Sequence, residues 1–304
     1  MEADFKEIKK IYSGSGERVD IYLKSVLNGF SRQLIKAMIE KGYVKINRDV
    51  VKPSYILKSG DEITIVLNRE NKKDFNLKDI IIYEDDDIIV LNKPAGLIVH
   101  PPGESWLTNP DALMFSQQSL ALLLYSQSSI SKSDVRRMGL VHRLDAETSG
   151  VMVVAKKFSI QRFLMEQFSS RSVDKNYKAV VCGVVSDDKI IIDAPIGRFS
   201  GDKRLRVMEY GRDAVTEISV IERGSKNSYL DVFPKTGRTN QIRIHLSYIG
   251  HPIVGDEVYG GKEYKRLMLH SYSIAFIHPS SKKYVRFKAE PDRDFENFIS
   301  ELLA

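Results

Sequence analysis

The pattern of apolar and polar positions changes its period along the chain, and these changes mark the predicted elements. In the N-terminal quarter, apolar residues first recur at helical spacing and then alternate as in half-buried strands. Ser31 is a suitable N-cap for the second helical stretch, which ends before Gly42. The predicted elements are helices at 18–29 and 31–41 and strands at 43–47 and 63–67. They indicate a small domain over residues 17–76, preceded by a polar lead-in at 1–16.

A longer region with a mostly strand-like pattern begins near residue 80, after a polar linker at 68–79. Short runs rich in β-branched residues alternate there with a few helical stretches. The predicted strands are 81–83, 88–91, 151–154, 177–185, 190–192, 215–221 and 229–233, and the predicted helices are 159–168, 240–249 and 295–303. Many strands with few helices predict an α+β fold with a mostly antiparallel, mixed sheet over residues 80–304.

Composition narrows the class of protein without identifying a function. The 304-residue chain carries 46 Lys and Arg against 40 Asp and Glu, a net charge of +6, which favours a polyanionic partner. No apolar run approaches the roughly 20 residues of a membrane-spanning helix, and the first residues lack an apolar signal segment. The single cysteine, Cys182, excludes an internal disulfide framework. These features predict a cytoplasmic protein without a membrane partner.

One carboxylate lies in a segment rich in turn-forming residues. Residues 139–150 read Gly-Leu-Val-His-Arg-Leu-Asp-Ala-Glu-Thr-Ser-Gly, and a β-branched run follows. Asp145 lies two residues after Arg143 and just before the Thr-Ser-Gly turn. A carboxylate at such a turn is held by rigid structure and can face a cleft, although a side chain that only caps its turn would give the same pattern.

Four stretches, in the expected order, resemble the RluA/RluC/RluD family of RNA pseudouridine synthases. They are residues 92–101, 142–150, 175–179 and 236–245. The similarity extends from about residue 80 to the C-terminus, and its form is closest to the RluC/RluD branch, which modifies large-subunit ribosomal RNA. Residues 31–63 resemble the alpha-L RNA-binding domain that was first described in a small-subunit ribosomal protein. Motifs in this order are specific to the family.

The resemblance implies an isomerase that acts on specific uridines of large-subunit (23S) ribosomal RNA and serves ribosome biogenesis. It implies that Asp145 is the catalytic aspartate at the sugar–base junction of a flipped-out uridine, with Tyr177 stacked on the base and Arg243 beside the carboxylate. Attack on the sugar and removal of its 2′ proton both suit this aspartate. No cofactor or metal is expected, because an isomerisation needs neither and the sequence has no phosphate-cradling loop or thiolate cluster.

RNA contacts are expected from basic residues in both parts of the chain. The candidates are Lys93, Arg143, Arg32, Lys36 and Lys41. The last three would lie on the second helix of the alpha-L domain, although an ordinary solvated helix face would carry similar charges. We expect the protein to be a monomer.

Two parts of the sequence depart from the family pattern. Asn240 stands where the family usually has His, and because an amide carries no charge, this position is not an essential acid or base. Residues 103–138 match weakly and read either as a helix with mobile flanks or as an insertion that contacts RNA.

Two other functions are considered beside the pseudouridine synthase. The first is a non-catalytic RNA-binding ribosome-assembly factor of the same fold, which the presence of Asp145, Tyr177 and Arg243 disfavours. The second is a glycoside hydrolase, which would need a second carboxylate at a defined separation. Glu147 is near in sequence, but a turn would direct it away from Asp145.

Overall fold

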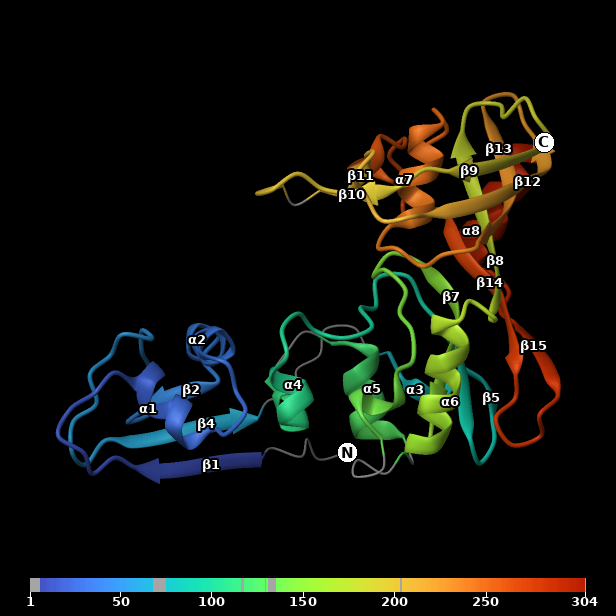
Figure 1. Cartoon of the computed structure of the whole chain (residues 1–304). Coiled ribbons are helices and arrows are strands. Elements are labelled where there is room, and N and C mark those ends of the chain that lie inside the picture. The colour runs from blue at the N-terminus through green and yellow to red at the C-terminus, as the bar shows by residue number, and fades with distance from the viewer. Residues whose placement is uncertain are drawn as a thin grey trace. The chain divides into compact units, whose positions relative to one another are not determined.

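The computed structural model describes residues 6–67, 75–115, 118–128, 130, 135–202 and 204–303. These residues form two compact units (Figure 1). The first unit contains the described residues up to Leu77 together with those of 100–132 and 136–138. The second contains those of 78–99, 133–135 and 139–304.

The first unit has an antiparallel sheet of four described strands. Two helices lie between the first and second of these strands along the chain. The strand order is β1 (Lys6–Ile11), β4 (Glu62–Leu67), β2 (Val44–Ile46) and β3 (Asp49–Val50). The helices are α1 (Val19–Val26) and α2 (Arg32–Glu40). The Ser31 hydroxyl caps α2 by accepting a hydrogen bond from the Leu34 N–H at 3.2 Å. Ile35 and Met38 of α2 are fully buried, as its helical pattern predicts.

Strand β1 corrects the prediction of a polar lead-in at 1–16, of which residues 1–5 lie outside the described residues. β1 pairs with β4 along its whole length, from Lys6 opposite Leu67 to Ile11 opposite Glu62. It lies at the edge of the sheet, and Ile11 is 72% exposed. An edge strand with a solvent-facing side can have few apolar residues, so its sequence resembles a polar tail.

The described residues of the weakly patterned segment 103–138, except Val135, belong to the first unit and form short helices, instead of continuing the larger domain from residue 80. Its elements are α4 (Ser105–Thr108), the 3₁₀ helix η1 (Pro110–Phe115), α5 (Leu120–Gln127) and η2 (Arg137–Gly139), while 116–117, 129 and 131–134 lie outside the described residues. The Phe115 ring contacts the Phe30 ring, with centroids 5.6 Å apart. The Thr108 hydroxyl donates to the Gly29 carbonyl at 3.1 Å. The ring contact and the hydrogen bond join segments that are distant in sequence.

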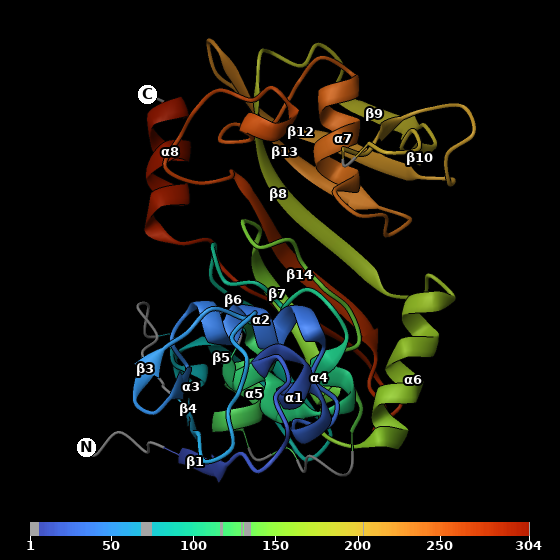
Figure 2. The same ribbon diagram turned by 90° about the vertical axis from the view of Figure 1, so that its left-hand side faces the viewer.

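The second unit is built on a nine-stranded mixed sheet of the described residues. Its order is β5 (Ile81–Glu84), β6 (Ile88–Lys93), β7 (Ser149–Ala155), β14 (Leu269–Ile277), β8 (Asp174–Cys182), β13 (Asn227–Pro234), β12 (Val215–Arg223) and β9 (Lys189–Asp193), with β15 (Tyr284–Lys288) paired to β14. Only β7 and β14 pair in parallel among these strands. Figure 2 shows the long strands β8 and β14 side by side. The predicted α+β class with a mostly antiparallel sheet is confirmed.

Helices and short elements complete the second unit. They are α3 (Leu77–Ile80, which begins at the last residue of the first unit), α6 (Phe158–Ser169), α7 (Gln241–Tyr248), α8 (Arg293–Leu303), the 3₁₀ helix η3 (Glu257–Tyr259) and the strand pair β10 (Ile196–Gly197) and β11 (Arg206–Val207). One core cluster joins Ile242 and Leu246 of α7 to the sheet, with Phe295 of α8 beside them. A second cluster places Leu164 of α6 with Val153 of β7. These cores fix α7 against the sheet.

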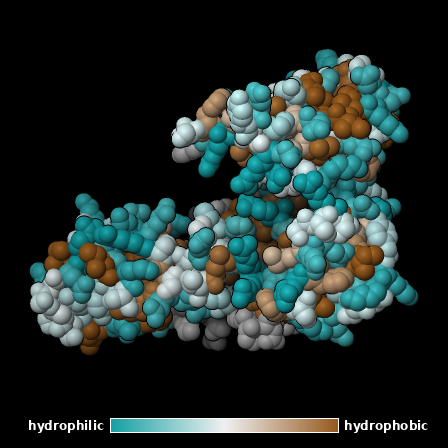
Figure 3. Space-filling view, in the orientation of Figure 1, coloured by the Kyte–Doolittle hydropathy of each residue, from teal (hydrophilic) through white to brown (hydrophobic). Residues whose placement is uncertain are grey.

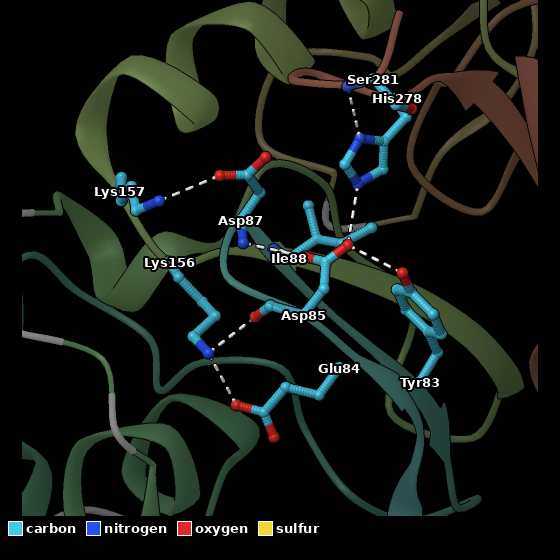
Figure 4. Close-up of polar contacts among 9 residues, drawn as sticks. All are labelled: Tyr83, Glu84, Asp85, Asp87, Ile88, Lys156, Lys157, His278 and Ser281. Carbon is cyan, nitrogen blue, oxygen red and sulfur yellow. Dashed lines mark hydrogen bonds and ion pairs between the residues drawn. The ribbon is translucent and has the colours of Figure 1, made fainter. Parts of the chain in front are cut away.

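The turn between β5 and β6 is organised by the carboxylate of Asp85 (Figure 4). Its oxygens accept hydrogen bonds from the N–H groups of Asp87 and Ile88, at 2.8 and 2.9 Å, and from the Tyr83 hydroxyl at 2.8 Å. His278, after β14, contacts the same carboxylate through Nε2 at 2.9 Å. One carboxylate therefore joins two separate connections of the sheet.

Hydrophilic and neutral side chains cover most of the face shown in Figure 3, and apolar side chains gather there in small groups. None of the helices in the described part of the chain has the length and apolar character needed to cross a membrane.

Candidate active site

A cleft of about 830 Å³ opens in the second unit. It lies between the loop that carries Asp145, the beginning of β8, and the turn that leads into α7. All three predicted catalytic residues, Asp145, Tyr177 and Arg243, line it. The fold therefore brings together residues that are nearly 100 positions apart in sequence.

The loop that carries Asp145 is held by backbone hydrogen bonds. The Asp145 carbonyl accepts from the Thr148 N–H at 3.3 Å, so the backbone closes this turn and the carboxylate faces the cleft. The next carbonyl, of Ala146, accepts from the Gly96 N–H at 2.8 Å. Gly150 ends the loop with a φ of +116°, and a Cβ there would lie 2.3 Å from the Ser271 carbonyl oxygen. Only glycine permits this close approach of β7 to β14.

Lys93 is buried beneath the surface and bonds to the backbone of this loop. This placement corrects the prediction that Lys93 contacts RNA. Its side chain is fully buried, and its ammonium group donates to the carbonyls of Pro94, Leu97 and Ala146 at 2.9, 2.8 and 3.0 Å. Three acceptors match the three N–H bonds of an ammonium group, so none is left for a phosphate. Burial lowers the pKa of Lys93 to about 7.

The carboxylate of Asp145 is partly buried and faces one cation and one amide. Nη1 of Arg243 lies 3.8 Å from Oδ2 of Asp145. The Asn240 amide is assigned with its nitrogen toward Asp145, because this orientation satisfies both ends of the amide; the nitrogen then donates to Oδ2 at 2.7 Å and lies 3.2 Å from Oδ1. Burial raises the pKa of Asp145 above the usual carboxyl value, and the guanidinium groups of Arg243 and Arg143 oppose this without reversing it.

The Arg243 guanidinium forms a bidentate ion pair with a different carboxylate, that of Asp256. Its Nε and Nη2 atoms donate to the two oxygens of Asp256, each at 2.7 Å. The Asp256 carboxylate is fully buried and also accepts from the Tyr259 N–H at 3.2 Å. Sequence reasoning missed Asp256, although the pattern Gly-Asp-x-x-Tyr-Gly at 255–260 was a usable signal. Asp256 fixes Arg243 and leaves Nη1 to face Asp145.

Tyr177 projects from β8 into the cleft at the point where β8 pairs with β13 and β14. Its ring is partly exposed, and burial raises the pKa of its hydroxyl to about 12. The phenol is therefore protonated near neutral pH. An aromatic ring with one accessible side can stack on a planar ligand.

The turn before α7 is held by Gln241, which sequence reasoning also missed. Its amide nitrogen donates to the Val215 carbonyl and the Thr216 hydroxyl, each at 3.0 Å, and its oxygen accepts from the Thr236 hydroxyl at 2.6 Å. These bonds attach the turn at residues 236–241 to β12 and so place Asn240 and Arg243 at the cleft.

The histidines of the site motifs are buried or partly buried and form hydrogen bonds within the fold. His142 accepts from the Val153 N–H through Nε2 at 3.0 Å and stacks on Phe168, and burial lowers its pKa to about 3. The rings of His245 and His270 are buried and hydrogen-bonded to hydroxyl groups and carbonyls on both sides. Within the described residues, no three His, Cys, Asp or Glu side chains lie close enough to hold a metal ion.

Positive side chains line the cleft. They are Arg143, Arg171, Lys175, Lys235, Arg238 and Arg286, in addition to Arg243. Arg143 is exposed, as a residue that contacts RNA must be. In the first unit, Lys36 and Lys41 are exposed, and Arg32 shares the buried carboxylate of Asp20 with Arg18. The cleft is suited to a polyanion.

Comparisons with known proteins agree with this geometry. Residues 87–248 match the family described as RNA pseudouridylate synthase, and residues 17–63 match the S4 domain. The chain is 39% identical to an "Uncharacterized RNA pseudouridine synthase" of Aquifex aeolicus, over 95% of each chain. It is 34% identical to "Ribosomal large subunit pseudouridine synthase C" of Salmonella typhi, over 95% of this chain and 93% of the other. The solved structure of human "RNA Pseudouridylate Synthase Domain Containing 4" aligns with a TM-score of 0.58 and 26% identity, over 75% of this chain and 94% of that one.

Proposed function

Since the chain belongs to the RNA pseudouridylate synthase family, we propose that it converts specific uridines of large-subunit (23S) ribosomal RNA to pseudouridine with Asp145 as its catalytic residue. The observation that carries this proposal is the placement of one carboxylate, beside the Arg243 guanidinium and the Tyr177 ring, in a cleft lined by cations. The large-subunit substrate is supported by the name of the relative from Salmonella typhi.

The substrate would reach this carboxylate as a nucleotide turned out of its helix or loop. Unstacking a base costs a few kcal/mol, and stacking on an aromatic ring offsets about 1–3 kcal/mol of that cost. The partly exposed ring of Tyr177 is placed for such stacking. Arg143 and other cations that line the cleft would hold the phosphates on either side.

The reaction breaks the bond from uracil N1 to the sugar, turns the base and forms a bond from C5 to the same carbon. The Asp145 carboxylate would either attack this anomeric carbon or remove the 2′ proton. The proton on C5 leaves after the new bond forms, and N1 ends with a proton, so the atoms of uridine and pseudouridine balance. Because its pKa is about 12, Tyr177 is protonated near neutral pH and serves better in stacking and donation than as a base.

The first unit would bind structured RNA. Residues 17–63 match the S4 domain and include α2, with the exposed side chains of Lys36 and Lys41. Arg32 would contribute as well, since its side chain is half exposed although it pairs with Asp20. Basic side chains bind phosphates and give affinities that fall with salt.

Pseudouridine mapping on total RNA tests the proposal. Cells that contain the wild-type chain, no chain or Asp145→Asn are compared. A site that is present with the wild-type chain and absent in the other two identifies the enzyme and its uridine together. The same map in all three samples would contradict the proposed catalytic role and favour an RNA-binding ribosome-assembly factor.

A further inference from the structure

Asn240 makes the shortest polar contact with the Asp145 carboxylate. Its amide nitrogen lies 2.7 Å from Oδ2 of Asp145, whereas the nearest atom of Arg243, Nη1, lies 3.8 Å from that oxygen. Arg243 cannot approach with two parallel hydrogen bonds, because its Nε and Nη2 atoms are bound to Asp256. The carboxylate is therefore oriented by a hydrogen bond from a neutral amide. The guanidinium of Arg243 stabilises its negative charge electrostatically from a longer distance.

The direction of the Asn240 amide is set by the Asp145 carboxylate, which only accepts hydrogen bonds, whereas the Tyr259 hydroxyl can donate or accept. The amide oxygen accepts a hydrogen bond from the Tyr259 hydroxyl at 3.1 Å when the nitrogen faces Asp145. The opposite orientation would place the oxygen against the carboxylate, an acceptor against acceptors. The Tyr259 ring is buried, and the guanidinium groups of Arg243 and Arg204 lie 5.2 and 5.0 Å from its centroid.

The backbone of Asn240 is also fixed. The residue precedes α7 in the left-handed conformation, with φ 55° and ψ 21°, and its carbonyl accepts from the Ile244 N–H at 2.9 Å. Asparagine tolerates this conformation better than most residues. The side chain thus starts from a rigid helix end that Gln241 holds against β12.

We propose that Asn240 is a positioning residue, which orients the Asp145 carboxylate toward the substrate and stabilises its ionised form. Tyr259 supplies the hydrogen bond at the other end of the amide when its nitrogen donates to Asp145. This inference rests on the catalytic role proposed for Asp145. The other titratable groups that interact electrostatically with this carboxylate are Arg243, Arg143, Glu147, Lys93 and Tyr177.

Asn240→Ala tests the inference in the full-length protein with a ribosomal RNA fragment that contains the mapped uridine. The single-turnover rate should fall roughly 10- to 100-fold, the loss expected for one hydrogen bond to a charged group. The affinity for RNA should change less than about twofold, because the amide carries no charge. The acidic limb of the pH–rate profile should move to higher pH, since the carboxylate has lost a donor.

Asn240→His and Tyr259→Phe separate positioning from a purely structural role. An imidazole N–H can donate from the same place, so Asn240→His should recover most of the rate. Tyr259→Phe removes the donor to the amide oxygen and leaves the amide nitrogen facing Asp145, and should lower the rate by a smaller factor than Asn240→Ala. Asn227→Ala is the matched control, because Asn227 lies opposite Cys182, at the other end of the β8–β13 pairing from Tyr177.

Carbon NMR of labelled aspartate carboxyls gives a measurement that needs no activity. The Asp145 signal, assigned by its loss in Asp145→Asn, should titrate about 0.5 pH units or more higher in Asn240→Ala than in the wild type. An unchanged titration in a folded Asn240→Ala protein would overturn the inference. A shifted titration in a protein that modifies no RNA would support Asn240 as the residue that stabilises Asp145 and overturn only the proposed function.

Discussion

At the scale of single residues, the Asp145 carboxylate shows how burial competes with charge. The sequence suggested that a neighbouring cation would keep it readily ionised. The structure places Arg243 at 3.8 Å, with most of its guanidinium committed to Asp256. Desolvation therefore has the larger effect, and the pKa of Asp145 is raised.

The pH dependence of activity follows from this shift. Catalysis by Asp145 needs the ionised form, so kcat/KM should fall with a slope of one on the acidic side. The midpoint should lie above about pH 4, the value of an ordinary carboxyl group. The midpoint is measured from single-turnover rates on an RNA fragment that contains the unmodified target uridine, with a correction for unfolding of the protein at each pH. A midpoint at or below that value would contradict the raised pKa.

Asp145→Asn should keep the fold while it removes activity. A carboxyl whose pKa is higher in the folded than in the unfolded state costs stability, and this cost grows as pH rises through the unfolded value toward the folded one. Near neutral pH the neutral amide should therefore be as stable as the wild type or more stable. Urea unfolding near pH 7 checks this, and a large loss of stability would show that the carboxylate is needed for folding.

The ion pair of Arg243 and Asp256 should be much more important for stability than an exposed pair. Asp256→Asn leaves a buried guanidinium without its anion, which should cost about 3–5 kcal/mol of unfolding free energy. Glu217→Gln is the matched control, because Glu217 pairs with Lys235 and the side chains of both are more than a third exposed, and it should cost less than about 1 kcal/mol. Equal losses in urea unfolding would contradict this ranking.

At the scale of elements, turns determine how the strands of the second unit meet. The Asp85 carboxylate joins the β5–β6 turn to His278 after β14 and accepts from two N–H groups and a hydroxyl (Figure 4). These donors lower the pKa of Asp85 even though burial alone would raise it. The ionised form is therefore the one that stabilises this end of the sheet.

Asp85→Ala should lower the unfolding free energy by about 2 kcal/mol or more, because buried donors lose their acceptor. A carboxyl with a lowered folded pKa stabilises above its unfolded value, near about 3.9, and the stabilisation is lost as pH falls through the folded value. The difference between wild type and variant should thus be largest near neutral pH and shrink in acid. Asp86→Ala, at an exposed neighbouring carboxylate, should have little effect in the same urea titrations.

At the scale of the whole molecule, positive charge is found in both compact units. The first unit matches the S4 domain and exposes Lys36 and Lys41, and the second has a cleft lined by cations. Charge on two units suits a long RNA better than a small ligand, since each neutralised phosphate adds to the affinity and to its salt dependence.

The double variant Lys36→Ala, Lys41→Ala should weaken RNA binding and lower the slope of log Kd against log salt by about 1–2. The single-turnover rate at saturating RNA should stay the same, because the cleft is untouched. Lys265→Ala, Lys283→Ala removes the same charge from exposed positions of the second unit and is the control. Equal weakening by both double variants would indicate a general charge effect and contradict a specific role for α2.

Local sequence patterns determined the periodic elements and the residues of the site. Helices α2 and α6 agree with their periodicity because each buries one face against a core, whereas α7 and β7 are buried on more than one face. Turn chemistry around Gly150 and the family motifs identified Asp145, Tyr177 and Arg243, which the fold then brings to one cleft. Local spacing was sufficient here, because these features depend on neighbours in the chain.

Only the tertiary structure decided which partner each charged group has. Lys93 looks like a surface cation in sequence but is buried against three carbonyls, and Arg243 forks to Asp256, 13 residues away, instead of Asp145. The packing of α4, η1 and α5 in the first unit and the pairing of β1 were decided in the same way. Burial, pKa and hydrogen-bond direction depend on groups brought close by folding, and spacing along the chain does not encode them.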